Sequence, residues 1–517
     1  IQGMALFYNK EEMLMKFFNK ILSVLAVCGF IMLSIPFSAI PVEAAILYTL
    51  NDGVLTIKSQ GVIEKYSDGT KLPWYDERDQ ITSIVLQDGV TEIGDSLFSN
   101  LTALETVRFP DTLISIGTNS FRNCSALKSI ELPSSLISIG TGAFGNCTKL
   151  QSARLSEGLE SVGSWSFAYC SELTEIQLPE TLTEIGSAAF YECSSLTNIT
   201  IPANVTELKE FTFAVCSALE DITIQGELTY LGGGVFSGTK WFSEQKDWVI
   251  VQDKFLQTYR GSDTELVIPD GVEFICDSAF SNKNIRSIVL SDSVKSIGSN
   301  AFAGTDLETI DLNQAEIIGE SAFNGCEKLT SLTIPDSVTS IGGMLISDCT
   351  SLTDLQLSNS LTSIPRNAFY NCTALTEVTI PTSVTTIEKY AFYKCDSLEK
   401  IRIPESVISI EDYALGYING STVSKILTIY GYFESAAESY AIENNVSFIS
   451  MSSETVKGDV NNDGFFTIAD VILMQKWLVA KPDAILENWK AGDLCEDNII
   501  DVFDLCLMKR KLIEQGV

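Results

Sequence analysis

The chain has 517 residues, 45% of them apolar and only 13 of them proline, so it can bury a large core and does not have the composition of a disordered polymer. Its 34 basic and 67 acidic residues give a formal net charge of −33, which argues against nucleic acid or an anionic membrane as a partner, because both require clustered Lys and Arg. The chain has no histidine, which excludes the Ser–His and Cys–His pairs of nucleophilic enzymes.

Residues 1–44 are predicted to be a signal peptide with an over-extended N-terminus. Lys16 and Lys20 precede an apolar run over residues 21–35, and a Val-Glu-Ala segment that ends at Ala44 provides a cleavage site. The apolar run is short for a membrane anchor. We therefore expect the mature chain to be secreted and to have no membrane span.

Residues 45–80 are predicted to be an N-terminal cap hairpin. Two alternating apolar and polar runs flank an Asn-Asp-Gly turn at residues 51–53, and the segment is out of register with the repeats that follow. Trp74 and Tyr75 lie in this segment. They could stack on a sugar, but aromatic packing under a cap is the favoured interpretation.

A pattern of about 23 residues then repeats over residues 81–449. Its anchor is the position of Ile139 in the pair Ile139-Gly140, and twelve of the thirteen intervals between successive anchors are 21 to 23 residues long. Such a period predicts a solenoid, in which each repeat buries its apolar face against its neighbours. The anchors are Ile93, Ile116, Ile139, Val162, Ile185, Leu208, Leu231, Ile275, Ile297, Ile318, Ile341, Ile364, Ile387 and Ile410.

One repeat shows how the chain is expected to fold locally. Leu127, Ile130 and Leu132 form the L-x-x-I-x-L pattern of a strand with its apolar side chains inward. Gly140 permits a tight bend, and Ala143, Phe144 and Cys147 follow at turn spacing and complete the core positions. At this point the chain resembles the BspA-like leucine-rich repeats of bacterial surface proteins, a family known mostly for adhesion and protein binding. The fold class is therefore expected to be mainly β, a leucine-rich-repeat solenoid.

Nine cysteines occupy one position of the repeat. A secreted protein invites a disulfide interpretation, but side chains stacked in parallel do not point at one another. We favour buried thiols that act as small core residues; a soft-metal ladder is the weaker alternative. The nine are Cys124, Cys147, Cys170, Cys193, Cys216, Cys326, Cys349, Cys372 and Cys395.

The exposed column of the predicted main sheet is polar, mixed in charge and free of aromatic residues, which favours a broad protein contact over a sugar platform or an enzyme cleft. Its members are Arg108, Glu131, Arg154, Gln177, Thr200, Thr223, Val289, Asp311, Thr333, Gln356, Thr379 and Arg402.

Between Leu231 and Ile275 the period breaks to 44 residues, and residues 238–264 read as an inserted hairpin that projects from the repeats. Trp241, Trp248 and Tyr259 are its candidates for ligand contact, although a structural insertion is the favoured interpretation. Residues 424–449 resemble the closing cap of the BspA-like family, and residues 450–456 form a polar linker.

Two acidic loops of twelve residues follow, each running into an amphipathic helix. In the first, loop positions 1, 3, 5, 9 and 12 carry Asp459, Asn461, Asp463, Thr467 and Asp470, with Gly464 at the turn. In the second, the corresponding oxygen donors are Asp493, Asp497, Asp501 and Asp504, with Cys495 at position 3 and Asn498 at the turn. Hard Ca²⁺ prefers such oxygen clusters. We therefore predict two calcium ions, with a weaker second site unless Cys495 is instead bridged to Cys506.

The duplicated loops, each ending in Asp, resemble a type I dockerin over residues 457–514, a small all-α calcium-binding module. The resemblance implies docking to a cohesin on a scaffoldin and an extracellular, cellulosome or cell-surface location. Ile468 and Ala469 replace a common Ser/Thr pair, so ruminococcal dockerins are the closer likeness. By resemblance, the cohesin would contact Ile468, Ala469, Gln475, Lys476, Val502, Phe503, Lys509 and Arg510.

These observations favour a secreted, non-catalytic repeat protein that is anchored to a scaffoldin cohesin through calcium. Its repeats would bind protein, cell-surface or plant-wall ligands. Two alternatives remain open: a catalytic cellulosome component for polysaccharide degradation, whose paired carboxylates the sequence does not exclude, and a scaffold-borne protein inhibitor.

Overall fold

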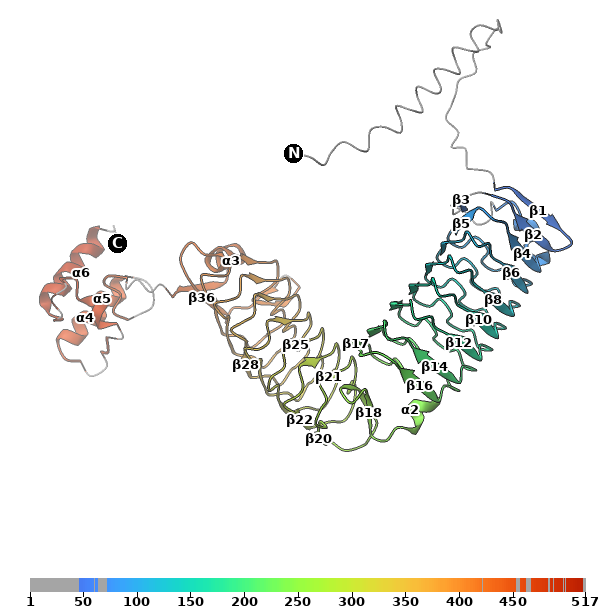
Figure 1. Ribbon diagram of the computed structural model, residues 1–517. Helices are drawn as coiled ribbons and strands as arrows, with labels where there is room; N and C mark the ends of the chain where they lie inside the picture. Colours follow the sequence, from blue (N-terminus) through green and yellow to red (C-terminus); the bar gives the residue numbers. More distant parts are fainter. Residues whose placement is uncertain are drawn as a thin grey trace, which may run out of the picture. The chain divides into compact units, whose positions relative to one another are not determined.

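The computed structural model describes residues 46–59, 61–63, 72–420, 422–451, 456–461, 466–481, 484–486, 488–495, 497 and 499–514 (Figure 1). The predicted signal peptide, most of the predicted linker, and Asp463, Gly464 and Asn498 of the predicted calcium loops lie outside the described residues. Among the residues described, none of the helices combines the length and the apolar character that a membrane crossing requires.

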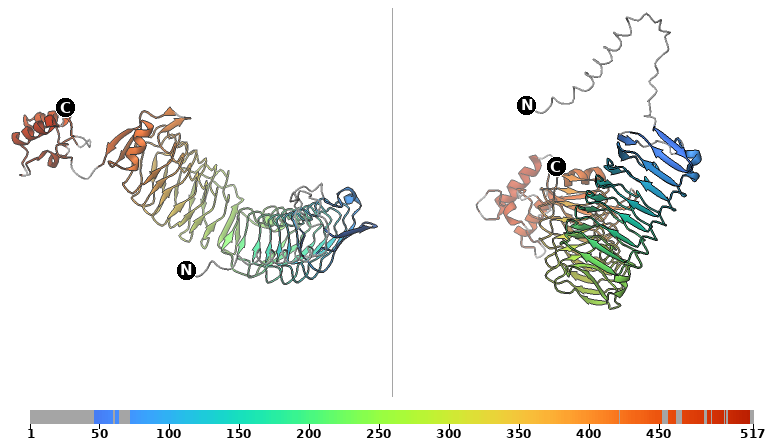
Figure 2. Two further views of the ribbon diagram at one scale, coloured as in Figure 1. Left: turned by 90° about the horizontal axis from the view of Figure 1, so that it is seen from above. Right: turned by 45° about the vertical axis from the view of Figure 1, so that its right-hand side comes forward.

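The repeats form the predicted solenoid, whose short strands stack in parallel and in register. Ala153, for example, lies opposite Ile130 of the preceding repeat and Ile176 of the next. Figure 2 shows from two further directions the strands of neighbouring repeats lying side by side. The main-sheet strands are β4 (Ser83–Leu86), β6 (Thr106–Arg108), β8 (Ser129–Glu131), β10 (Ser152–Arg154), β12 (Glu175–Gln177), β14 (Asn198–Ile201), β16 (Asp221–Ile224), β20 (Glu265–Val267), β22 (Ser287–Val289), β24 (Thr309–Asp311), β26 (Ser331–Thr333), β28 (Asp354–Gln356), β30 (Glu377–Thr379), β32 (Lys400–Arg402) and β36 (Thr428–Gly431).

A second ladder of shorter strands contains the anchors of the repeats. Each anchor is buried except Ile410, which is half-buried, and the anchors of paired strands lie opposite one another, as Ile116 and Ile139 do. The strands are β5 (Val90–Ile93), β7 (Ser115–Ile116), β9 (Ser138–Ile139), β11 (Ser161–Val162), β13 (Glu184–Ile185), β15 (Glu207–Leu208), β17 (Tyr230–Leu231), β21 (Phe274–Ile275), β23 (Ser296–Ile297), β25 (Ile317–Ile318), β27 (Ser340–Ile341), β29 (Ser363–Ile364), β31 (Thr386–Ile387) and β33 (Ser409–Ile410).

A stack of phenylalanines fills the core next to this ladder. Phe190 is fully buried, with its ring 5.5 Å from that of Phe167 and 5.3 Å from that of Phe213, and the rings are nearly parallel. The same stacking runs from Phe98 to Phe236. Because each ring touches the equivalent ring of the next repeat, a repeat completes its core only with its neighbours.

The nine ladder cysteines are buried and unbridged, as predicted. The Cys147 thiol lies 3.3 Å from the carbonyl oxygen of Phe121, and the Cys193 thiol lies 3.2 Å from that of Phe167, so each thiol donates to the repeat before it. Burial raises the pKa of Cys124 and of Cys170 to about 12, which keeps both thiols neutral at physiological pH. They act as small core residues with one weak donor each.

The first strands close the N-terminal end of the sheet. β1 (Tyr48–Asn51) and β2 (Val54–Ile57) form an antiparallel hairpin, and β2 pairs in parallel with β4. The turn residues Asp52 and Gly53 both have positive φ, as a tight hairpin turn requires. β3 (Gly61–Ile63) pairs with β5, and a 3-10 helix, η2 (Tyr75–Gln80), precedes β4.

The inserted hairpin does not project from the repeats, contrary to the prediction. Helix α2 (Lys240–Glu244) leads into β18 (Trp248–Val251), which pairs antiparallel with β19 (Phe255–Tyr259). β19 in turn pairs in parallel with β21, so the hairpin starts the second run of repeats. The amide of Gln252 in its turn bonds to the carbonyl oxygen of Gly226 at 2.7 Å and accepts from the N–H of Leu228 at 3.0 Å. Polar contacts therefore join the insertion to the preceding repeat.

The last repeats end in a mixed cap. β34 (Tyr417–Asn419) and β35 (Thr422–Val423) pair antiparallel, and β37 (Ser447–Ser450) adds in parallel to β36. Helix α3 (Ala436–Asn444) lies between β36 and β37 in the sequence. The hydroxyl of Ser435 caps its beginning, and the helix ends at Asn445, which has a left-handed conformation.

Three helices follow: α4 (Ile468–Leu478), α5 (Trp489–Gly492) and α6 (Val502–Glu514). Among the described residues, their buried apolar core comprises Val460, Val471, Met474, Leu505, Met508 and Leu512, and partly buried residues such as Phe466 and Ile500 pack against it.

Candidate functional site

In the first acidic loop, the carboxylate of Asp470 reaches from the first turn of α4 back to the beginning of the loop. One oxygen accepts from the N–H groups of Val460 (3.1 Å) and Asn461 (3.2 Å), and the other accepts from the N–H (2.8 Å) and hydroxyl (3.2 Å) of Thr467. The hydroxyl of Thr467 caps α4 and accepts a hydrogen bond from the N–H of Ala469 at 3.1 Å. Asp470 is fully buried and Asp459 is 3% exposed, so the loop holds two carboxylates away from water.

The second loop repeats this arrangement. One oxygen of Asp504 accepts from the N–H groups of Leu494 (2.9 Å) and Cys495 (3.2 Å). The other oxygen accepts from the backbone N–H of Asp501 (3.0 Å). Asp493 accepts from the N–H of Asp497 at 3.1 Å. Burial opposes ionisation of Asp504, but these N–H donors outweigh it and hold its pKa below the ordinary value. The carboxylate is therefore charged at neutral pH.

Cys495 faces the same centre as two of these carboxylates. Its sulfur and one oxygen each from Asp493 and Asp504 all lie within 4.8 Å of one another. Partial burial and a hydrogen bond to Asp504 raise the pKa of the thiol to about 12. Cys495 and Cys506 are both free, so the alternative of a bridge between them is wrong.

The donor chemistry of both loops fits a hard divalent cation. Asp459, Asp470 and Asp504 are buried and Asp493 is half-buried, so the carboxylates at the first and last loop positions would repel one another without a counter-charge, and Ca²⁺ accepts such oxygens at flexible distances. The second loop offers a sulfur where the first offers the amide of Asn461, which is a poorer match to calcium.

All eight residues expected at a cohesin surface are exposed. Ile468 and Ala469 begin α4, and Val502 and Phe503 begin α6, so the two loops present equivalent apolar pairs. Ile468, Val502 and Phe503 are 58%, 65% and 63% exposed and are therefore accessible to a partner. Gln475, Lys476, Lys509 and Arg510 are exposed further along the same helices, and Arg510 pairs with Glu514 at 2.9 Å.

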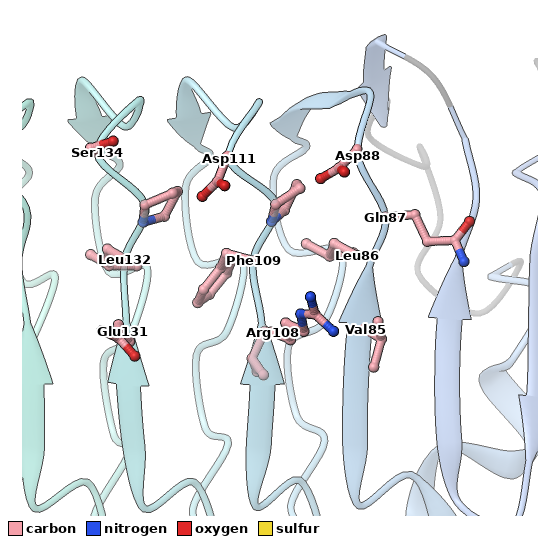
Figure 3. A pocket seen from close by; sticks show the side chains of 13 residues that line it. Val85, Leu86, Gln87, Asp88, Arg108, Phe109, Asp111, Glu131, Leu132 and Ser134 are labelled. Carbon is pink, nitrogen blue, oxygen red and sulfur yellow. The ribbon is translucent and has the colours of Figure 1, made fainter.

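The main sheet carries a polar groove of 860 Å³ near its N-terminal end. Figure 3 shows Val85, Arg108 and Glu131 at the ends of neighbouring strands, with Asp88 and Asp111 in the turns beyond. Glu131 forms an ion pair with Arg154 of the next repeat at 3.1 Å. Alternating charge in an open groove is suited to a protein surface.

Of the aromatic residues that the sequence singled out, Trp74, Trp241, Trp248 and Tyr259 are packing residues, whereas Tyr75 is half-buried with the guanidinium of Arg78 4.2 Å from its ring centre. Trp74 is 1% exposed and stacks on Phe98 at 5.7 Å. Trp241 packs against Phe236 at 5.4 Å, and Trp248 packs against Tyr259 at 4.6 Å. The favoured structural interpretations of the cap and the insertion therefore agree with the structure.

Other aromatic residues, which the sequence reasoning did not single out, lie exposed on the turns that follow the second ladder. Trp165 is 42% exposed, and Tyr169 and Tyr191 are partly exposed beside it. Aligning the residues three and seven positions after each anchor would have shown Trp165 and Tyr169 among the aromatic residues of these columns, together with Phe211, Tyr390 and Tyr413.

Comparison with known proteins agrees with both parts of the chain. The model of the BspA type leucine rich repeat region (6 copies) matches residues 74–171, 152–245, 254–349 and 312–422, and that of the dockerin type I domain matches residues 457–513. A search of curated proteins gave no match.

Solved structures of bacterial repeat proteins are also similar. A leucine-rich repeat protein from Eubacterium ventriosum is 27% identical, with 73% of this chain and 94% of that one covered and a TM-score of 0.41. A leucine rich cell surface protein from Faecalibacterium prausnitzii is 25% identical, with 80% and 98% covered and a TM-score of 0.32.

The dockerin match implies calcium binding and cohesin-mediated attachment to a cellulosome, and the repeats imply a binding role. Both matches indicate an extracellular or cell-surface location. The family model of the BspA-type repeats matches more than half of this chain. The chain therefore belongs to the BspA-type leucine-rich repeat family, and it carries a type I dockerin domain.

Proposed function

We propose that this protein is a secreted, non-catalytic binding component that is held on a scaffoldin cohesin by its dockerin domain, while its solenoid binds an extracellular ligand. The observation that carries the proposal is the duplicated arrangement of Asp470 and Asp504. Each carboxylate returns from the start of a helix to the start of its own loop.

In this proposal two calcium ions order the dockerin domain. Asp459, Asn461, Asp463, Thr467 and Asp470 hold the first ion. Asp493, Asp497, Asp501 and Asp504 hold the second, and calcium itself supplies the counter-charge that the buried carboxylates need. The ordered helices then present Ile468 and Ala469, and equivalently Val502 and Phe503, to the cohesin.

A non-catalytic role is supported by the chemistry of the solenoid face. The chain has no histidine, and the groove carboxylate Glu131 is engaged by Arg154. The groove is formed by regular strands and short turns, whose alternating charges suit recognition of a partner surface.

The experiment is isothermal titration of the full chain with a panel of ruminococcal cohesins, with calcium and with a chelator. Binding should require calcium. A double variant, Ile468→Asp and Val502→Asp, should weaken it at least tenfold. Ile513→Asp is the matched control, because Ile513 is 74% exposed and lies outside the expected contact surface. Calcium-independent binding, or equal weakening by the control, would contradict the proposal.

A further inference from the structure

The turns after the second ladder have a backbone that disfavours large side chains. Residues three and seven positions after the anchor have positive φ in repeat after repeat, for example Asn119 (55°), Asn123 (63°) and Asn146 (61°). Asn and Gly tolerate this left-handed region, whereas bulky residues do so at a cost. Trp165 (59°) and Tyr169 (64°) nevertheless occupy these two positions in one repeat. Bulky residues hold the same positions in other repeats, among them Phe211 (58°), Tyr390 (63°) and Tyr413 (61°), so the aromatic surroundings of Trp165, and not its backbone, distinguish this repeat.

These two residues and Tyr191 of the next repeat form one exposed aromatic cluster. The Trp165 ring lies 6.4 Å from that of Tyr169 and 5.5 Å from that of Tyr191, and the two tyrosine rings lie 5.5 Å apart. Within residues 72–420, all of which the structure describes, no hydrogen bond engages the indole N–H or either phenol hydroxyl. All three polar groups are available to a ligand.

A cavity of 360 Å³ lies beside the cluster, at the lower end of the range for small-ligand sites. Gly142 and Gly145 of the preceding repeat contribute no side chain there, which leaves space in front of Trp165 and Tyr169. The remaining lining includes the amide side chain of Asn146 and the guanidinium of Arg122, which lies 3.4 Å from the amide oxygen of Asn119. Aromatic faces thus meet planar hydrogen-bonding groups at one place.

A second aromatic cluster lies in the later repeats and differs from the first because cations lie over its rings. Tyr370 and Tyr393 stack at 5.5 Å, and Tyr390 and Tyr413 also stack at 5.5 Å. There, cations cover the rings: Lys394 lies over Tyr370 at 5.5 Å, and Lys389 lies over Tyr390 at 5.3 Å. In the described part of the chain no Lys or Arg lies over Trp165, Tyr169 or Tyr191, so all three rings of the first cluster are free of such cations.

We propose that Trp165, Tyr169 and Tyr191 form a binding site for a neutral polysaccharide chain of pyranose units. The axial C–H face of a pyranose is apolar and packs on the electron-rich face of an aromatic ring, while its equatorial hydroxyls need donors and acceptors at the rim. Arg122, Asn119 and Asn146 supply them. The net charge of −33 disfavours an acidic polymer. This inference rests on the proposed binding role of the solenoid and assigns it a location and a ligand class.

The test is affinity electrophoresis of the full chain in gels containing hydroxyethylcellulose, xyloglucan or polygalacturonate. Titration calorimetry with the neutral polymer that retards migration most then gives the affinity. We expect retardation by at least one neutral polymer and none by polygalacturonate. Trp165→Ala should weaken binding at least tenfold, and Tyr169→Ala should weaken it less. Trp489→Ala is the matched control, because Trp489 is also 42% exposed but lies in the dockerin domain.

Circular dichroism melting checks that the variants fold, and cohesin titration of the same samples separates this inference from the proposed attachment. Loss of polysaccharide binding with intact cohesin binding supports the site. The inference is overturned if the wild-type chain binds neither neutral polymer, if it prefers polygalacturonate, or if Trp165→Ala and Trp489→Ala behave alike. In each of these cases an intact cohesin titration would leave the attachment standing.

Discussion

In the solenoid, an internal ring such as that of Phe190 is packed between identical rings of its two neighbours, and the core from Leu256 to Val446 is a single cluster. In the dockerin domain the described core cluster contains six buried apolar residues with others partly buried around them, and next to it lie the buried carboxylates of Asp459, Asp470 and Asp504. The first module gains its stability from repeated apolar burial. For the second, whose dockerin match implies calcium binding, we predict that a bound cation contributes to the fold, because carboxylates are buried beside its core.

The largest single-residue effect is expected in the solenoid core. Phe190→Ala removes a fully buried ring and should cost about 3–5 kcal/mol, because it loses both stacking partners and leaves a cavity. The solenoid transition should melt at a lower temperature, and calcium should not restore it. Phe211→Ala, at a ring that is 50% exposed in the next repeat, is the control and should change the melting temperature little. Equal effects would mean that stacking does not hold the repeats together.

Within the dockerin domain, the two loops themselves are expected to differ. Cys495→Asn places an amide oxygen where the first loop has Asn461 and should tighten the second calcium site by about tenfold, or roughly 1.4 kcal/mol. Calorimetric titration of the full chain should resolve a strong and a weak site before the change and two similar sites after it. Cys506→Ser, at an exposed thiol in α6, is the control. Two sites of equal affinity in the unmutated protein would refute the role assigned to loop position 3.

The smallest effect is expected at the thiol ladder. Cys193→Ala removes one buried sulfur and one weak hydrogen bond to Phe167, so the solenoid should lose about 1 kcal/mol. In the unmutated protein a thiol reagent should label the ladder cysteines only after denaturation, because all nine are buried and burial also raises the pKa of thiols such as Cys124 and Cys193. Rapid labelling of the folded solenoid would show that the ladder opens locally.

Sequence reasoning succeeded where a periodic pattern determines the structure. The anchors, such as Ile139 and Ile185, and the ladder cysteines are buried in register, because each side chain has an equivalent neighbour one repeat away. The spacing from Asp459 to Asp470 likewise anticipated a carboxylate that returns to the start of its loop.

It failed where the structure depends on tertiary contacts that no period encodes. The insertion pairs β19 with β21, and that register is set by the neighbouring repeat. Trp165 escaped notice because its contacts with Tyr169 and with Tyr191 of the next repeat are visible only in the structure.

The most direct test of the contrast between the two modules is differential scanning calorimetry of the full chain, with excess calcium and with a chelator. Two transitions should appear in calcium, and the chelator should abolish the smaller one or strongly lower its melting temperature. The reason is that free calcium at 100 times Kd contributes about 2.7 kcal/mol of stability per site. The larger transition, that of the solenoid, should not move. If both transitions shift together, or if neither does, then calcium is not the element that distinguishes the dockerin domain from the solenoid.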